Sequence, residues 1–204
     1  MKKLAIVGAG MMGEALARGL LGSGWTGTDL ILADISSERL DQMGEALGAA
    51  TTSDATDACR RADGVLLAVK PQDAPVALGS FAGSVGGSGL VSIVAGMRTS
   101  AIESHLGDGS SVVRAMPNTP ARVGRGVTAL AAGSATSPQT RELADAIFSA
   151  VGPVVWLDEE LLDAVTAVSG SGPAYVFYLA EAMVRAGIDL GLDPDTAATL
   201  AFAT

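Results

Sequence analysis

Short apolar runs alternate with segments of helical periodicity from residue 4 to residue 157. The runs are nearly continuous, as in strands that are buried on both faces of a parallel sheet. They lie at residues 4–7, 29–34, 64–69, 90–95, 111–114, 126–131 and 153–157. The segments that predict helices lie between them, at residues 14–21, 52–62, 99–106 and 137–150 and from residue 36 onward. Strands and helices in alternation predict an α/β fold with a doubly wound, mainly parallel sheet.

The pattern changes to helices only after residue 157. Residues 159–168 have helical periodicity, residues 169–173 interrupt it, and a last helix begins at about residue 194. We therefore expect two domains, a sheet domain over residues 1–157 and an all-helical domain over residues 158–204. The last helix is cut off in mid-pattern at Thr204, so the chain looks incomplete at its C-terminus.

One helix of the second domain, at residues 173–190, has an unusual surface. Its charges are Glu181, Arg185 and Asp189, which are spaced four apart and form one narrow stripe. The rest of its circumference is apolar, and such a helix is buried either in a core or in a subunit interface. An oligomer is the natural inference, so residues 158–204 are predicted to begin a dimerisation domain.

A Gly-x-Gly-x-x-Gly motif follows the first apolar run directly and opens the first helix. In this arrangement Gly8 allows the sharp turn, Gly10 lets a pyrophosphate approach the backbone, and Gly13 lets the helix pack closely on the strand. The helix N-terminus favours an anion. A merely structural turn is the alternative, and the flanking strand and helix disfavour it. The motif predicts a Rossmann-like domain whose cofactor-binding residues are Val7, Gly8, Ala9, Gly10, Met11, Met12 and Gly13.

The end of the second apolar run bears on the choice of cofactor. Asp34 lies about 20 residues after Gly13, where an acid bonds the ribose hydroxyls of NAD. Ser36, Ser37 and Arg39 follow at once, and they could hold the 2′-phosphate of NADP. A capping role for Asp34 at the next helix is the alternative. NADP(H) and NAD(H) therefore both stay open.

Loops at the ends of later strands are further candidates, because ligands of doubly wound sheets lie outside the carboxyl ends of the strands. Lys70 follows the strand at residues 64–69 and is placed to face the cofactor, with a solvated surface lysine as the alternative. Asn118 lies between Pro117 and Pro120 in a rigid loop after another strand.

The composition excludes several other classes of function. Hydrophobic residues make up 49% of the chain, as expected of a globular protein with a large core. The net charge is −9, and this negative charge argues against nucleic acid as a partner. No apolar stretch is long enough to span a membrane. The chain has a single cysteine, Cys59, and a single histidine, His105, so a zinc site built from these residue types is implausible. We expect Cys59 to be a small residue within a helix and His105 to lie on the surface. One cysteine suits a reducing compartment, so a cytoplasmic location is expected.

Four motifs together resemble the pyrroline-5-carboxylate reductase family, in that family's order and spacing over the whole chain. They are Gly8-Ala9-Gly10-Met11-Met12-Gly13, Ala68-Val69-Lys70-Pro71, Arg114-Ala115-Met116-Pro117-Asn118-Thr119-Pro120 and Ala167-Val168-Ser169-Gly170-Ser171-Gly172-Pro173-Ala174-Tyr175. The resemblance implies reduction of the ring imine of 1-pyrroline-5-carboxylate to L-proline with NADPH or NADH, the last step of proline biosynthesis. It also implies a homodimer built by the helical domain, which can assemble into a decamer.

The resemblance also implies roles for individual residues. Asn118 is expected near the nicotinamide and the substrate, Glu159 near the substrate's ring nitrogen, and Ser36 near a 2′-phosphate. Asp34 departs from the small or hydroxyl residue often found there. The cofactor is implied to be lined by Ala68, Val69, Lys70, Pro71, Ile93, Val94 and Ala95.

The same resemblance leaves the catalytic residue unassigned. The family has a Ser-Pro-Gly-Gly-Thr-Thr loop that binds the substrate carboxylate and places a hydroxyl at the imine nitrogen. This loop is expected beyond Thr204, so no catalytic residue is predicted within residues 1–204.

Two other functions remain as alternatives. One is a related imine or β-hydroxyacid reductase of the same plan. The hydroxyacid enzymes use a lysine of the helical domain as the acid or base, and this chain has no lysine after Lys70. The other is a non-catalytic module that binds a dinucleotide or supports assembly. Hydride transfer to an imine needs little acid–base help from side chains, so the lack of a catalytic dyad in the sequence is consistent with a reductase.

Overall fold

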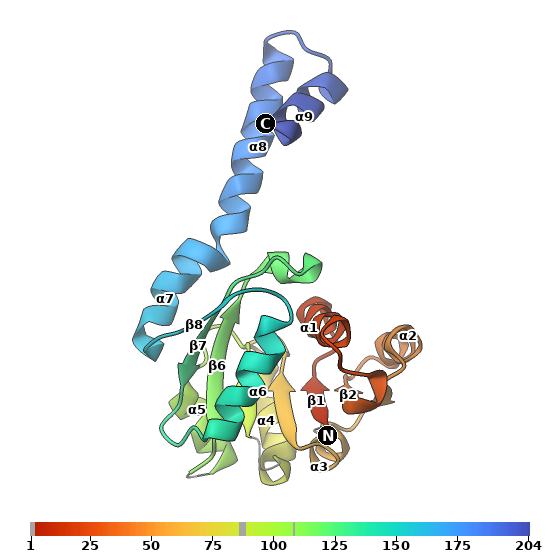
Figure 1. Cartoon of the computed structure of the whole chain (residues 1–204), viewed down its shortest axis with the longest axis vertical. Helices are drawn as coiled ribbons and strands as arrows, with labels where there is room; N and C mark the ends of the chain where they lie inside the picture. The colour runs from red at the N-terminus through yellow and green to blue at the C-terminus, as the bar shows by residue number, and fades with distance from the viewer. Residues whose placement is uncertain (1–2, 86–88, 108) are drawn as a thin grey trace.

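The computed structural model describes residues 3–85, 89–107 and 109–204. It contains one eight-stranded sheet with the strand order β3-β2-β1-β4-β5-β6-β7-β8 (Figure 1). The strands are β1 (Leu4–Val7), β2 (Leu30–Ala33), β3 (Ala50–Thr52), β4 (Gly64–Leu67), β5 (Leu90–Ser92), β6 (Val112–Pro117), β7 (Thr128–Ala132) and β8 (Val154–Trp156). All neighbouring pairs are parallel except β6 and β7. The predicted Rossmann-like, mainly parallel sheet is confirmed.

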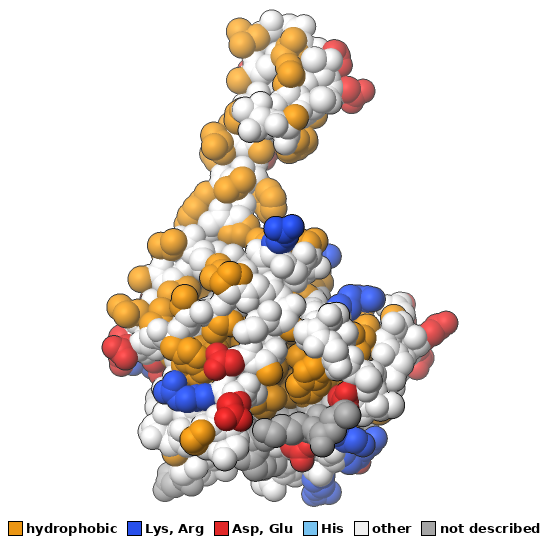
Figure 2. Space-filling view, viewed as in Figure 1, with side chains coloured by type: hydrophobic (Ala, Val, Ile, Leu, Met, Phe, Trp, Pro, Cys, Tyr) orange, Lys and Arg blue, Asp and Glu red, His pale blue; other side chains and the backbone are white. Residues whose placement is uncertain are grey.

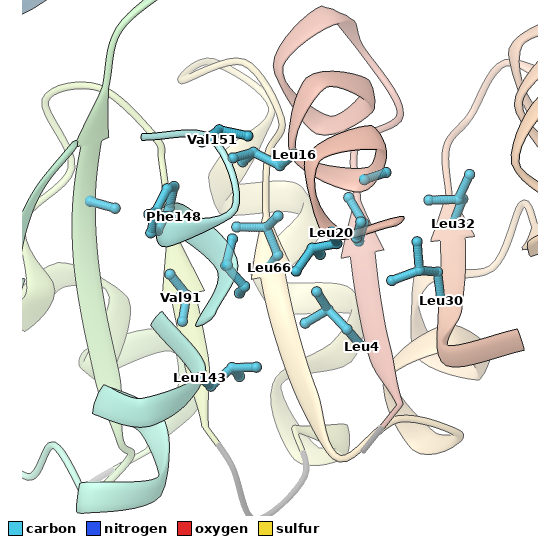
Figure 3. Close-up of a cluster of buried hydrophobic side chains, with 14 of the residues drawn as sticks. Leu4, Leu16, Leu20, Leu30, Leu32, Leu66, Val91, Leu143, Phe148 and Val151 are labelled. Carbon is cyan, nitrogen blue, oxygen red and sulfur yellow. The ribbon is translucent and has the colours of Figure 1, made fainter. Parts of the chain in front are cut away.

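Helices cover both faces of the sheet, and the alternation of side chains along each strand decides what they cover. In β1, Leu4 and Ile6 point to one face while Ala5 and Val7 point to the other. The first face carries α1 (Met11–Gly22), α2 (Ser37–Leu47) and α6 (Pro138–Ser149); the second carries α3 (Ala55–Arg60), α4 (Ala74–Phe81) and α5 (Thr99–Leu106). Figure 3 shows the first core, where leucines of α1 meet those of β1, β2 and β4.

The structure corrects some of the predicted boundaries. Thr52 ends strand β3 and does not begin a helix, and α3 starts only at Ala55. The strand was missed because Ala50–Thr52 is a short, partly exposed edge strand without an apolar run. Helix α4 was not predicted, since it has only eight residues and Gly79 in its interior lowers its helical propensity. Strand β7 is antiparallel to β6 because the short connection between them, a 3₁₀ turn at Thr119–Val123, leaves no room for a crossover helix.

The chain leaves the sheet at β8 and continues as an arm of helices. The arm begins with a 3₁₀ turn and contains a π-helical turn; its elements are Glu159–Leu161, α7 (Leu162–Val165), Thr166–Gly170, α8 (Gly172–Asp189) and α9 (Pro194–Ala203). Figure 1 shows α8 and α9 projecting from the sheet domain. No residue of α8 is buried within this chain. None of the helices in the described part of the chain has the length and apolar character that crossing a bilayer requires.

Candidate active site

The glycine-rich loop joins β1 to α1 beside the point where the strand order reverses, between β1 and β4. In doubly wound sheets a crevice forms at this point, outside the carboxyl ends of the strands. Gly8 has a φ of +105°, and a Cβ there would lie 2.5 Å from the carbonyl oxygen of Ala68 at the end of β4. A Cβ on Gly13 would lie 2.2 Å from the carbonyl oxygen of Gly8. Both glycines are therefore required by close backbone packing.

Gly10 differs from these two glycines. A Cβ on it would meet nothing within 4 Å, so the space in front of this residue is open. Gly10 is also the N-cap of α1, and as a glycine it offers no side chain to cap that helix N-terminus. The N–H groups of the first helical turn are then available to an anion, which the helix dipole also favours. An open cradle at a helix N-terminus fits the pyrophosphate of a dinucleotide.

Asp34 links the glycine-rich loop to the loop after β2. Its Oδ2 accepts a hydrogen bond from the Ala9 N–H at 2.8 Å, and its Oδ1 accepts one from the Ser36 N–H at 3.0 Å. The N-cap of α2 is Ser36, whose Oγ accepts from the Arg39 N–H. Asp34 is thus not the N-cap, and its half-buried carboxylate lies beside the loop that would hold the cofactor.

Arg39 reaches from the first turn of α2 to the same loop. Its Nε donates to the carbonyl oxygen of Ala9 at 2.6 Å, and its Nη2 donates to the carboxylate of Glu14 in the first turn of α1. Glu14 also accepts from Arg18 Nε at 2.8 Å. Hydrogen bonds from Arg39 and Arg18 hold the pKa of Glu14 below its ordinary value. Glu14 was missed in the sequence, although its place directly after the glycine motif could have drawn attention to it.

The remaining predicted cofactor residues lie at the carboxyl ends of β4 and β5. These strands are adjacent, with Leu67 opposite Ser92, so the loops after them share one edge of the sheet. Lys70 is exposed there. Val94 is only 2% exposed and its side chain belongs to the second core, so only its backbone can face a ligand. The others are exposed or half-buried at this edge: Ala68, Val69, Pro71, Ile93 and Ala95.

Asn118 is placed at the end of β6, and its side chain joins two segments. Its Oδ1 accepts from the Val127 N–H at 2.9 Å, and its Nδ2 donates to the carbonyl oxygen of Ser169 at 3.3 Å. Ser169 belongs to the π-helical turn at the base of the arm. Such turns are frequent at functional sites. Asn118 therefore holds the base of the arm against the end of β6.

Glu159 has both carboxylate oxygens occupied by groups of the sheet domain. Oε1 accepts from the Thr99 N–H at 2.8 Å and from Arg114 Nη1 at 3.2 Å, and Oε2 accepts from Thr99 Oγ1 at 2.8 Å. Burial opposes ionisation, but these hydrogen bonds and the arginine charge outweigh it, so the pKa of Glu159 is lowered. The sequence did not reveal that Thr99 and Arg114 hold this residue, because the three are far apart in the chain.

Thr204, beyond which the resemblance places the loop with the catalytic hydroxyl, is itself engaged with its own helix. It is the C-cap of α9, and its Oγ1 donates to the carbonyl oxygen of Leu200 at 2.7 Å. Figure 1 shows this end of the chain beside α8, on the part of the arm that projects from the sheet domain. The catalytic hydroxyl expected after Thr204 stays a prediction.

Cys59 and His105 lie away from the carboxyl edge of the sheet. Cys59 is buried in α3, and burial raises the pKa of its thiol to about 12, so it stays protonated and unreactive. His105 is exposed on α5 with its Nδ1 at 2.8 Å from the carbonyl oxygen of Ala101. Within the described residues, no group of three or more His, Cys, Asp or Glu side chains is arranged to hold a metal ion.

These features define a dinucleotide-binding protein of the Rossmann type. Comparison with known proteins agrees and is more specific. The family model "NADP oxidoreductase coenzyme F420-dependent" matches residues 3–96, and the model "Pyrroline-5-carboxylate reductase dimerisation" matches residues 159–204.

Relatives that align with the whole chain carry the same family name. The pyrroline-5-carboxylate reductase of Mycobacterium tuberculosis strain H37Rv is 44% identical over 100% of this chain and 71% of its own length. That of Synechocystis sp. is 40% identical over 99% of this chain and 76% of its own. Among solved structures, the Coxiella burnetii enzyme matches 99% of this chain and 76% of its own with a TM-score of 0.91 and 35% identity.

A second solved structure, the Plasmodium falciparum pyrroline carboxylate reductase with NADP bound, has a TM-score of 0.87 and 28% identity over 99% of this chain and 75% of its own. The chain belongs to the pyrroline-5-carboxylate reductase family. This confirms the reductase interpretation and makes the chain an NAD(P)H-dependent oxidoreductase, and the match of residues 159–204 to the dimerisation model suggests a homo-oligomer.

Proposed function

We propose that the chain reduces 1-pyrroline-5-carboxylate to L-proline by hydride transfer from NAD(P)H held along the carboxyl edge of the sheet. The observation that carries this proposal is the open Gly10 cradle at the N-terminus of α1, in the same chain as a segment that matches the reductase dimerisation model. A bound nicotinamide supplies the hydride, and a protonated imine is already electrophilic. The main tasks of the protein are to orient the two reactants and to exclude water.

Individual residues have roles that follow from their positions. Gly10 and the first N–H groups of α1 bind the pyrophosphate, and the loops after β4 and β5 line the nicotinamide half. Asp34 and Ser36 lie where the adenosine ribose binds. Asn118 positions the substrate side of the site by holding the π-helical turn in place. Glu159, expected to contact the substrate's ring nitrogen, is assigned an anchoring role because Thr99 and Arg114 occupy its oxygens.

The domain division and the assembly are part of the same proposal. Residues 1–157 form the dinucleotide-binding domain and residues 158–204 begin the dimerisation domain, since β8 ends at Trp156 and only helices follow. A homodimer that associates further into a decamer is proposed from the family resemblance. The net charge of −9 supports the proposal that nucleic acid is not a partner, because a polyanion would be repelled. A cytoplasmic location is proposed because the single cysteine allows no intramolecular disulfide.

The proposal is tested by following NADPH and NADH oxidation by the purified protein with and without added 1-pyrroline-5-carboxylate. We expect oxidation that depends on this substrate with at least one cofactor. A Gly10→Val variant, whose added side chain occupies the cradle, is the matched control and should lose the activity. Cofactor binding without any substrate-dependent oxidation would contradict the proposal and favour a non-catalytic binding module.

A further inference from the structure

Arg39 lies in the first turn of α2, directly after the loop that follows β2, and its guanidinium already has two partners. Its guanidinium lies between the first turns of α1 and α2, bonded to the carbonyl oxygen of Ala9 and to Glu14. The side chains of Arg39 and Glu14 are 28% and 27% exposed, so solvent and ligands can reach the pair. This contact joins the glycine-rich loop to the β2–α2 loop, at whose end the adenosine ribose of a dinucleotide binds in this fold.

The two nicotinamide cofactors differ only at that ribose, where NADPH has a phosphate and NADH has a hydroxyl. Arginine binds phosphate well because its planar fork of N–H donors matches the oxygen atoms. In this chain a 2′-phosphate that bound Arg39 would compete with the Glu14 carboxylate, and Asp34, whose Oδ2 accepts from the Ala9 N–H, adds a second negative charge beside the same loop. The hydroxyl of NADH needs no such exchange, and Asp34 can accept its hydrogen bond.

Glu14 has a second partner that makes the exchange feasible. Arg18 lies one turn further along α1 and donates its Nε to the other carboxylate oxygen of Glu14 at 2.8 Å. When a phosphate takes Arg39, Glu14 keeps a cation beside it and is not left unpaired. The pair can therefore open and close without any change of the helix.

We propose that Glu14 is a specificity-determining residue for the cofactor, because it competes with the 2′-phosphate of NADPH for the guanidinium of Arg39. The ratio of NADPH affinity to NADH affinity is then set by the Glu14–Arg39 pair together with Asp34. This inference rests on the proposed function only in that a nicotinamide dinucleotide binds at the glycine-rich loop.

The test is a double-mutant cycle of Glu14 and Arg39. The affinities of the full chain for NADPH and for NADH are measured directly, for example by calorimetry without substrate. Glu14→Gln frees Arg39, and we expect the NADPH affinity to rise about fivefold while the NADH affinity changes less than about twofold. In the Glu14→Gln/Arg39→Gln double variant the gain should disappear. Glu45→Gln removes the same charge from an exposed position further along α2 and should leave the ratio unchanged.

Arg39→Gln alone is the independent arm, and it should weaken NADPH binding more than NADH binding. An unchanged ratio in Glu14→Gln, or a gain that persists without Arg39, would overturn the proposal. Equal weakening of both cofactors in Arg39→Gln would also overturn it, since Arg39 would then serve only to hold the Ala9 loop. A wild-type chain that binds neither cofactor would instead contradict the proposed function, so the two failures are distinguishable.

Discussion

The sheet domain and the helical arm use similar apolar side chains in opposite ways. In the sheet domain, Leu16, Leu20 and Phe148 are fully buried against the strands. In the arm, Phe177 is 68% exposed and Leu179 is 61% exposed, and α8 has no buried residue. Figure 2 shows hydrophobic side chains along the surface of the arm. The sheet domain thus completes its core within one chain, while the arm does not.

The difference shows what a second copy of the chain must supply. A helix that is apolar nearly all round has no stable place in water, and α9 packs on only part of α8, where Gly187 meets Ala197 and Leu192. The reductase dimerisation model matches residues 159–204, which include both helices. We therefore assign the exposed apolar surface of α8 to the subunit interface. Changes there should affect assembly, and changes in the sheet domain should affect stability or cofactor binding.

The largest effect is expected for Leu179→Asp. Leu179 is 61% exposed on the apolar part of α8, outside the charged stripe, and an aspartate there would place a charge in the apolar interface. We expect the dimer dissociation constant to rise by at least about a hundredfold. Sedimentation equilibrium measures it, and circular dichroism should show an unchanged sheet domain. Arg185→Ala, in the stripe at an exposed i,i+4 ion pair with Glu181, is the control and should have little effect. A dimer of wild-type strength in Leu179→Asp would contradict the assignment.

A pair of glycine variants should separate stability from binding inside the sheet domain. Gly13→Ala forces a Cβ against the carbonyl oxygen of Gly8, so the free energy of unfolding should fall by roughly 1–3 kcal/mol. Gly10→Ala meets open space and should cost less than about 1 kcal/mol, but its methyl group should lower dinucleotide affinity at least about tenfold. Urea unfolding and cofactor titration measure the two effects. If the two variants lost the same stability and the same dinucleotide affinity, Gly10 would have no specific role in binding the dinucleotide.

A smaller effect is expected where the arm meets the sheet domain. Glu159→Gln removes the charge that pairs with Arg114, whose side chain is 8% exposed, and the free energy of unfolding should fall by about 2–3 kcal/mol at neutral pH. The adjacent, exposed Glu160→Gln should change it by less than about 0.5 kcal/mol.

The free energy of unfolding should depend on pH through the ionisation of Glu159. The folded-state pKa of Glu159 is below its ordinary value of 4.5, so its stabilising contribution is complete above pH 4.5 and is lost as the pH falls through the folded-state pKa. Glu159→Gln should therefore lose less stability than the wild-type chain over the same acidic range. If the free energy of unfolding fell equally with pH in the two proteins, the Glu159–Arg114 ion pair would not be the source of the acid sensitivity.

Much of the fold was predictable because buried strands leave a continuous apolar signal. The strands at the centre of the sheet and helix α5 lie where the pattern places them. The misses have physical causes. β3 is an edge strand with few apolar residues, and the antiparallel direction of β7 depends on the length of the loop before it.

The candidate site was predictable only where local sequence carries the chemistry. The glycine motif and the acid after β2 are read from spacing, and the structure places both at the same edge. The contacts of Glu14 with Arg39, and of Glu159 with Thr99 and Arg114, join residues far apart in the chain. No periodicity or short motif records such pairs, because they exist only once the sheet has formed.

The most direct test of the two-part account is hydrogen–deuterium exchange of the wild-type protein against Leu179→Asp. We expect amide groups of α8 and α9 to exchange much faster in the variant, because the variant would lose the partner subunit that we assign to this surface. Amide groups of β1 and β4 should keep their wild-type rates. Equal exchange of α8 in the two proteins, or an equal acceleration of β1 and β4, would contradict the account.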